Sequence, residues 1–427
     1  MKLTPLYLFS LVAGAGFAQP EPPRLSLQQA QSAATLSSPI LRAARAELAM
    51  ATATHRGLRT EIGPKASVNG FATSGNNSSI LGSAPLTDPG VNMQVPMGQF
   101  LSSNFMLMIP LLTNQLKEMV RASEWQTRAA AGDYREVQAE LEFRITESYY
   151  RALFATQEVA AAAAQLRATQ EMLRTTEARV ESGSAIPASA ERVRAEVARG
   201  ERELAASKSE AAKELLELKH AIGLELGEEI ALEPNPETAS HSTELSDLVA
   251  QATQRRGVLI AARARLESSH ADLRSAQAQS QPKIYALGMA DATNRRGMGG
   301  ITVGLTASFA VFDGGRNRAD VAKSRALRER SDAMLADLSL EVEKEVRQAV
   351  LDVETSESNL RSAEASLKSA QSAYEVMSLR VSAGKGILLE QLDALGVLKR
   401  ANADLAQARF DRHVAQARIT RATGGSR

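Results

Sequence analysis

The side chains that could carry chemistry are scattered along this chain rather than grouped. There is no cysteine, and the five histidines show no metal-ligand spacing. No glycine-rich loop suited to a phosphate is present. Asp313 precedes Gly314-Gly315, where the pattern predicts a turn between a strand and a helix rather than a catalytic carboxylate. The sequence therefore argues against an enzyme and predicts no cofactor and no metal site. The histidines are His55, His220, His241, His270 and His413.

Four methionines, Met93, Met97, Met106 and Met108, fall close together in the sequence. Thioethers are ligands for soft metal ions, so the group is compatible with metal handling. Positions in a loop and on a lipid-facing strand would explain the same residues equally well. The sequence leaves both interpretations open.

Charge and composition narrow the class of protein. The net charge is +1, from 50 basic and 49 acidic residues, so nucleic acid is not an expected partner. Aromatic residues make up only 4%, and alanine is abundant, which suits long helices packed closely together. Lys2, the apolar run from Leu6 to Phe17 and the final Ala18 predict a secretory signal peptide over residues 1–18. No later apolar run reaches about 18 residues, so no membrane helix is expected.

The mature chain contains an internal duplication. Arg179 to Gly223 aligns with Arg380 to Gly424 at an offset of about 201, and the segment starting at Pro39 aligns with that starting at Gly257 at about 218. We therefore expect two copies of one supersecondary unit. The predicted organisation is a first repeat over residues 19–223, a linker over 224–244 and a second repeat over 245–427.

Each copy is expected to read helix, strand, strand, long helix, turn and returning helix. In the first copy the pattern predicts a helix over residues 25–59 that is capped by Ser26 and Gln29, and strands over 65–73 and 104–112. A glycine-rich loop joins these strands, and helices over 115–181 and 188–223 follow. The second copy repeats this order with a helix over 245–279, strands over 283–290 and 301–312, a long helix and a returning helix.

The four strands are the most telling elements. Each has one apolar face and one small or polar face, and a tilted strand of about 9 to 11 residues can cross a membrane. In lipid only closed barrels satisfy every backbone group, and four strands cannot close a barrel alone. Several chains are therefore expected to share one barrel; the alternative is an ordinary small sheet on a helical domain. The expected lipid-facing residues are Ile301, Val303, Leu305, Ala307 and Phe309.

The two long helices need a partner outside a compact domain. A helix of about 67 residues is roughly 100 Å long. Apolar residues repeat every seven positions within both helices, for example at Leu360, Leu367, Tyr374 and Val381, which predicts a helix-helix seam. Long helical hairpins from several copies could continue the barrel as a hollow tube.

In this order of elements the chain resembles the TolC-type outer-membrane efflux protein family over nearly its whole mature length. The resemblance rests on the opening Leu25 to Ala30, the segment Pro39 to Ala46, the turn Val311 to Arg316, the two glycine-containing tips and the closing Ala422 to Gly424. It implies an α+β membrane protein in which three copies form a 12-stranded outer-membrane β-barrel and a periplasmic α-barrel tunnel. It also implies a duct that passively exports small molecules, drugs or metal cations, handed over by an inner-membrane pump through a periplasmic adaptor.

The resemblance carries over to two sets of residues. Glu390 and Asp393 match the carboxylates that ring the periplasmic end of the tunnel in such proteins, although acidic residues in a first helical turn also complement the helix dipole. The hairpin tips match the sites where adaptor hairpins dock, although turn chemistry alone would explain their glycines. Ala188 and Ser189 depart from the family's better-known latch, so no latch is expected there. The tip residues are Gly183, Ser184, Ala185, Ile186, Gly384, Lys385, Gly386 and Ile387.

Two alternative functions remain at this point. A type I protein-secretion channel uses the same architecture, and the short segment after Gly424 favours the export of small molecules. A periplasmic coiled-coil adaptor or scaffold would explain the hairpins and the signal peptide. It would not explain four alternating strands placed symmetrically in both copies.

Overall fold

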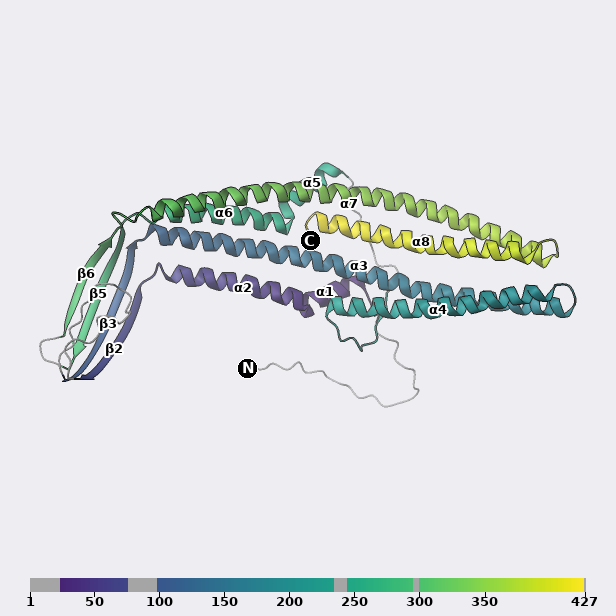
Figure 1. The fold of residues 1–427 in the computed structure, drawn as a ribbon, viewed down its shortest axis with the longest axis horizontal. Coiled ribbons are helices and arrows are strands. Elements are labelled where there is room, and N and C mark those ends of the chain that lie inside the picture. Colours follow the sequence, from purple (N-terminus) through teal and green to yellow (C-terminus); the bar gives the residue numbers. More distant parts are fainter. Residues whose placement is uncertain (1–23, 76–97, 234–243, 295–298, 426–427) are drawn as a thin grey trace. The chain divides into compact units, whose positions relative to one another are not determined.

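The computed structural model describes residues 24–75, 98–233, 244–294 and 299–425 (Figure 1). The predicted signal peptide lies outside these residues, as do most of the first-copy loop and part of the predicted linker. The chain divides into two compact units. Unit 1 holds the residues up to Leu36 together with Ser148–Glu237, and unit 2 holds Ser37–Glu147 together with Thr238–Arg427. This division does not follow the two sequence repeats, because each unit takes residues from the first.

Both predicted long helices are confirmed. Helix α3 spans Asn114–Glu181 and helix α7 spans Arg316–Ser382, with 68 and 67 residues respectively. The returning helices α4, Pro187–Ile222, and α8, Leu388–Ala422, are also confirmed. Gly223 ends α4 with a φ of 84°, a left-handed conformation that glycine adopts without a steric penalty. No helix within the described part of the chain is both long enough and apolar enough to cross a membrane.

The shorter helices correct the sequence analysis in the same way in both copies. The single helix expected over 25–59 is two helices, α1, Leu27–Ser37, and α2, Pro39–Thr60. The one expected over 245–279 is also two, α5, Leu245–Arg255, and α6, Gly257–Ala278. The predicted cap of the first helix is confirmed, since Ser26 N donates to Gln29 Oε1 at 3.0 Å and Gln29 N donates to Ser26 Oγ at 3.2 Å.

All four expected strands form one antiparallel sheet in unit 2, in the order β2-β3-β5-β6 (Figure 1). The strands are β2, Lys65–Gly75, β3, Gly98–Leu112, β5, Lys283–Thr293, and β6, Gly300–Ser308. Strand β3 begins six residues earlier than expected, because Gly98 pairs with Gly75 at the far end of β2. The paired ends of these two strands are rich in Ser and Gly and lack the apolar alternation that predicts a strand, so both strands were expected to be shorter.

Strand β6 is shorter than the sequence predicts, so Phe309 does not lie in a strand. The expected strand ran to Phe312, whereas β6 ends at Ser308, opposite Lys283 of β5. The residue before Lys283 is Pro282, which has no N–H to continue the ladder. The pairing therefore stops, and Phe309 and Phe312 are 63% and 90% exposed.

Unit 1 contains a small strand pair that the sequence analysis missed. Strand β1, Arg24–Leu25, runs parallel to β4, Ala231–Leu232, which lies in the predicted linker. The hydroxyl of the fully buried Tyr149 lies 2.9 Å from Leu25 O and 3.1 Å from Glu233 O. Burial raises the pKa of Tyr149 to about 12, so the phenol keeps its proton and donates it to these carbonyls.

Helices α7 and α8 run side by side (Figure 1), and buried residues of unit 2 lie along the seam between them. The predicted seven-residue spacing is confirmed at Leu360 and Leu367, which pack with Leu405 and Ala408 of α8. A second cluster joins the middle of α7 to the C-terminal end of α8 and to α5 and α6. Its α7 and α8 members are Val342, Val346, Ala349, Val353, Ala415, Ile419 and Ala422, and its α5 and α6 members are Leu248, Ala252 and Leu259.

Helices α3 and α6 approach each other so closely that neither tolerates a side chain at the crossing. A Cβ added to Gly132 would lie 2.6 Å from Ala261 N, and one added to Gly257 would lie 2.6 Å from Gly132 O. Gly132 therefore has a packing role in the long helix. The two backbones touch, which fixes the separation of these helices.

We expect Gly132→Ala to lower the free energy of unfolding by about 1–3 kcal/mol, because the helices must separate to admit the methyl group. The matched control is Gly396→Ala in α8, where an added Cβ meets no atom within 4 Å. Removing that glycine should raise stability by roughly 0.5–1 kcal/mol. Chemical unfolding followed by circular dichroism checks both, and equal stability of Gly132→Ala and wild type would contradict the crossing.

Candidate functional site

The sheet has two chemically different faces. Because side chains alternate along a strand, each row of paired residues lies on one face. The row Val68, Phe105, Ala290 and Ile301 crosses all four strands and is entirely apolar. The next rows on the same face are apolar as well, with Ala66, Leu107, Gly288 and Val303 in one and Ile109, Ala286 and Leu305 in the other.

This apolar face is uncovered in the single chain. Ile301, Val303 and Leu305 are 82%, 83% and 73% exposed, and Val68 of β2 is 74% exposed. The predicted lipid-facing residues Ile301, Val303, Leu305 and Ala307 therefore share one exposed face, and Phe309 follows the strand end. Each large side chain would contribute about 1.5–3 kcal/mol if it were buried.

The opposite face is mostly polar. One row contains Ser67, Met106, Met289 and Thr302, and the next contains Asn69, Asn104, Asp291 and Gly300. Asn69 Nδ2 donates to Asn104 Oδ1 at 3.0 Å across the β2–β3 pair. The register places Met106 and Met108 on this face, so they cannot belong to a lipid-facing surface formed by the apolar face. Met93 and Met97 lie outside the described residues.

The segment after β6 turns into α7, as its sequence predicts, and Asp313 binds backbone N–H groups at the start of that helix. Asp313 Oδ1 accepts a hydrogen bond from Gly315 N at 2.9 Å, and Asp313 Oδ2 accepts one from Asn317 N at 2.8 Å. The hydrogen bonds from the Asn317 and Gly315 backbones lower the pKa of Asp313. Both oxygens of the carboxylate therefore accept hydrogen bonds from backbone N–H groups at the start of α7. Within the described ranges, no three His, Asp or Glu side chains are grouped so that they could hold a metal ion.

The two hairpin tips share one backbone geometry. Gly183 and Gly384 have φ values of 73° and 71°. Ser184 N donates to Arg179 O at 2.8 Å, and Lys385 N donates to Arg380 O at the same distance. Each tip also presents a large apolar residue directly before the returning helix. These residues are Ile186 and Ile387, which are 67% and 59% exposed.

The predicted gate residues lie in the first turns of α8. Glu390 and Asp393 are both exposed and three positions apart, so they share a helix face. Gln391 between them is buried and donates from Nε2 to Ser378 Oγ of α7 at 3.3 Å. The carboxylates therefore point away from the seam of their own hairpin. In the first copy, α3 and α4 are joined near their tip by an ion pair, in which Arg194 Nη2 lies 2.7 Å from Glu177 Oε1.

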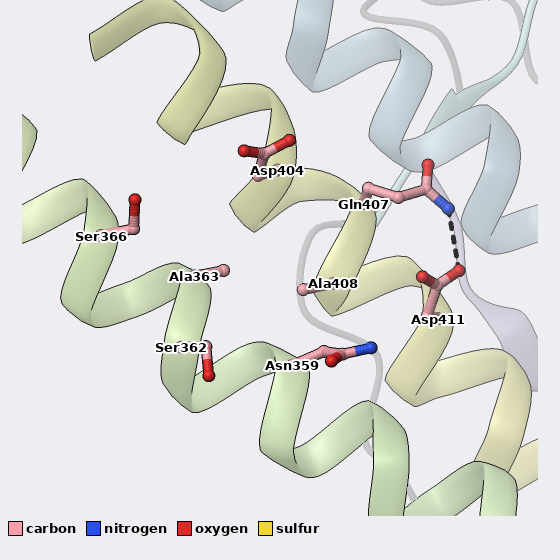
Figure 2. A pocket seen from close by; sticks show the side chains of 8 residues that line it. All are labelled: Asn359, Ser362, Ala363, Ser366, Asp404, Gln407, Ala408 and Asp411. Atoms are coloured by element: carbon pink, nitrogen blue, oxygen red, sulfur yellow. Dashed lines mark hydrogen bonds between the residues drawn. The ribbon is translucent and has the colours of Figure 1, made fainter. Parts of the chain in front are cut away.

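A polar groove of about 370 Å³ lies between α7 and α8 near the middle of the hairpin (Figure 2). The buried Ala363 and Ala408 form its floor, because their small side chains leave the seam underfilled. On its rim Gln407 Nε2 donates to Asp411 Oδ1 at 2.8 Å. The other lining residues are Asn359, Ser362, Ser366 and Asp404. Its polar side chains are exposed or half-buried, so the groove is part of the solvated hairpin surface.

The helix breaks of the two copies have the same backbone conformation but different causes. Ser38 has φ −59° and ψ 123°, and Arg256 has φ −60° and ψ 123°. Pro39 explains the first break, because a proline forces the preceding residue into extended backbone. No proline follows Arg256. The alignment at offset 218 pairs the two positions, and it was the one sequence signal that could have pointed to Arg256.

Arg256 is only 2% exposed and binds three helices. Its Nε lies 3.1 Å from both carboxylate oxygens of Glu136 in α3, and its Nη2 lies 2.7 Å from Glu345 Oε2 in α7. Its Nη1 donates to Arg421 O at 3.2 Å and to Ala422 O at 3.3 Å, the last carbonyls of α8. This buried cluster, together with the ion pair of Arg421 with Glu140 at 2.5 Å, is called the Arg256 network below.

A comparison with protein-family models matches the family described as outer membrane efflux protein over residues 30–224 and 248–425. The chain belongs to this outer membrane efflux protein family. The match begins in α1, leaves out the linker and the start of α5, and ends after α8. It therefore covers both predicted repeats. Family membership places the chain in the outer membrane and favours a channel over a soluble periplasmic adaptor or an enzyme.

Solved structures confirm the fold. CusC has 19% sequence identity and a TM-score of 0.81, over 98% of this chain and 96% of that chain. The outer membrane protein VceC of Vibrio cholerae has 18% identity and a TM-score of 0.79, over 94% and 96%. The Campylobacter jejuni CmeC outer membrane channel has 14% identity and a TM-score of 0.80, over 99% and 94%. A comparison with curated proteins found no match.

One titrating group lies inside the hairpin of this efflux protein. Burial, reinforced by the neighbouring charge of Arg412, lowers the pKa of His413 in α8 from 6.5 to about 4. Between these two values the unfolded chain binds more protons than the folded chain. The contribution of neutral His413 to stability is therefore complete above pH 6.5 and is lost as the pH falls towards 4.

We expect His413→Gln to flatten the fall in thermal midpoint between pH 6.5 and pH 4, because the variant has no imidazole to protonate. Midpoints measured by circular dichroism at several pH values would show this. His220→Gln, at an exposed position of α4, is the control and should keep the slope of the wild type. The interpretation fails if the two variants show the same slope.

Proposed function

We propose that three copies of this chain form a channel that exports small molecules, drugs or metal cations, across the outer membrane. The carrying observation is the four-stranded sheet, which has one continuous apolar face and two edge strands without a partner in the described chain. An unpaired edge in lipid leaves backbone N–H and C=O groups without water, which costs several kcal/mol for each group. Pairing β6 of one copy with β2 of the next removes both edges.

The dimensions of the sheet support this assembly. The strands contain 9 to 15 residues, and a tilted membrane strand needs about 9–11. Three copies of a four-stranded sheet supply twelve strands, enough to enclose a lumen, whereas four strands cannot close. In this arrangement the apolar rows meet lipid, and the rows that contain Ser67, Asn69 and Asn104 line the lumen.

The helices support a tunnel below the barrel. Leu340, Leu351 and Leu379 of α7 are 69%, 60% and 68% exposed in the single chain. Neighbouring copies would cover such residues and remove apolar surface from water. The relatives are described as an outer membrane protein and an outer membrane channel, which supports the same interpretation.

The hairpin ends supply the remaining parts of the proposal. Three copies of Glu390 and Asp393 would form a negative ring that narrows the periplasmic end and favours cations. The two glycine tips, with Ile186 and Ile387 exposed, would receive the helical hairpins of a periplasmic adaptor. That adaptor would connect the channel to an inner-membrane pump, so export through the channel itself is passive.

We expect Leu305→Arg to cost about 2–4 kcal/mol if this position faces the middle of the bilayer. The matched control is Thr306→Arg, since Thr306 is the next residue of β6 and lies on the opposite face. The readout is the fraction of trimer in detergent-extracted outer membranes. Equal assembly of the two variants would contradict the assignment of the apolar face to lipid.

We also expect the paired change Glu390→Gln and Asp393→Asn to raise single-channel conductance and weaken cation preference in planar bilayers, because it removes the negative ring without changing side-chain size. Glu364→Gln, at an exposed position of α7, removes one charge elsewhere on the hairpin and serves as the control. If the paired variant keeps the conductance and selectivity of the control, these carboxylates do not form the constriction.

A further inference from the structure

We propose that the Arg256 network holds the root of the α7–α8 hairpin in its resting position and so keeps the ring at its tip narrow. Arg256 would be a positioning residue for the channel, since it lies far along the helices from Glu390 and Asp393. This inference rests on the proposed channel function. It assigns a role to a buried ionic cluster of unit 2 that the fold alone leaves unexplained.

The first step is the helix break itself. The α5–α6 break has the conformation of the α1–α2 break but lacks the proline that causes the latter. In its place the side chain of Arg256 is held between two carboxylates and two carbonyls. Glu136 Oε2 also accepts a hydrogen bond from Val258 N at 3.2 Å, in the first turn of α6. The network therefore maintains a backbone conformation that the sequence does not impose locally.

The second step is the set of elements that the network joins. Through Glu345 it holds α7, and through Arg421 O and Ala422 O it holds the end of α8. Through Glu136 it ties both to α3, at a level where Gly132 and Gly257 already bring α3 and α6 into backbone contact. Both helices of the hairpin are thus attached to the same rigid crossing at one level.

The third step is the nature of the bond. A buried guanidinium presents several donors in a fixed plane, so it can bind a carboxylate through two atoms while reaching a second carboxylate and two carbonyls. Lysine keeps the charge but has one nitrogen, which cannot occupy these places together. Because the group is buried, solvent and salt weaken it much less than a surface pair.

The fourth step is the length of the hairpin, which converts a small rotation at its root into a displacement of its tip. From Glu345 to Ala383 at the tip, α7 runs for about 57 Å at 1.5 Å per residue. A rotation of about one degree at the root would move the tip by about 1 Å. The seam of Leu360, Ala363, Leu405 and Ala408 holds α7 to α8 beyond the root, so the hairpin would move as one body. A small loosening at Arg256 would therefore become a large displacement of Glu390 and Asp393.

The test uses the full-length protein in planar bilayers, with trimer content and thermal midpoint measured in parallel. Arg256→Lys should raise the open probability or mean conductance by about fivefold or more, a typical size for coupling between distant sites. Glu345→Gln, which removes the negative charge from the bond to α7 and leaves the other bonds of Arg256 in place, should act in the same direction. Arg265→Lys is the matched control, because Arg265 pairs with Asp133 between the same helices, α6 and α3, at the surface at 2.5 Å.

A rescue variant separates positioning from simple stability. The chain contains no cysteine, so a disulfide between Arg255→Cys and Gly424→Cys would be the only one present. A Cβ added at Gly424, whose φ is +110°, lies 2.8 Å from Arg255 Cβ, about 1 Å closer than the Cβ separation of a disulfide, so the turn after α8 must shift to form the bond. The same disulfide in the wild-type background is the control for that shift and should leave conductance unchanged. Oxidation should reattach the end of α8 in the Arg256→Lys background and return conductance to the wild-type value, and reduction should reverse it.

The outcomes distinguish the two levels of the proposal. If the wild-type protein forms no channels, the proposed function itself fails. If it does, but Arg256→Lys and Glu345→Gln form trimers with wild-type conductance, the positioning role is overturned. Loss of trimer in both variants, or a formed disulfide that leaves conductance raised, would also overturn it in favour of a role in folding alone.

Discussion

The structure depends on a constraint that one chain cannot meet, the pairing of every backbone group at the edges of its sheet. Strands β2 and β6 end an open sheet whose apolar face, including Ile301 and Val303, remains exposed. In water the unpaired N–H and C=O groups of such an edge pair with strands of other chains. In lipid each unpaired group costs several kcal/mol, so an open edge is not stable there. Assembly with other copies meets both requirements at once. The same logic applies to the apolar residues left exposed along α7.

The duplication reproduces backbone geometry more faithfully than side-chain chemistry. The two tips share a left-handed glycine and the same turn hydrogen bonds, and the two helix breaks share the same φ and ψ. Yet Pro39 makes one break and the buried Arg256 makes the other. Near the tips, an exposed Arg194–Glu177 pair holds one hairpin, and Gln391 with Ser378 holds the other. Divergence after duplication has therefore altered how each hairpin is held, while the fold has been kept.

Sequence patterns predicted the elements that depend on local periodicity. The long helices, the returning helices, the glycine tips and the turn at Asp313 all follow from spacing within one segment. The predictions failed where contacts distant in sequence decide. The pairing of Gly98 with Gly75 lengthens β3, Pro282 shortens β6, and Glu136, 120 residues from Arg256, holds a break that no local residue signals. Tyr149 belongs to the same class, because its partners lie 124 and 84 residues away, and so does the β1–β4 pair, which joins Leu25 to Leu232.

The charges of the α7–α8 hairpin are arranged so that its two ends respond differently to solvent. At the root, Arg256 is almost fully buried, and its pairs with Glu136 and Glu345 act at short range in a medium of low polarity. At the tip, Glu390 and Asp393 are exposed, and at physiological ionic strength salt screens their repulsion beyond about 8 Å. Ionic strength should therefore change the balance of forces at the tip far more than at the root. A hairpin held this way combines a root that salt affects little with a tip whose charges salt screens.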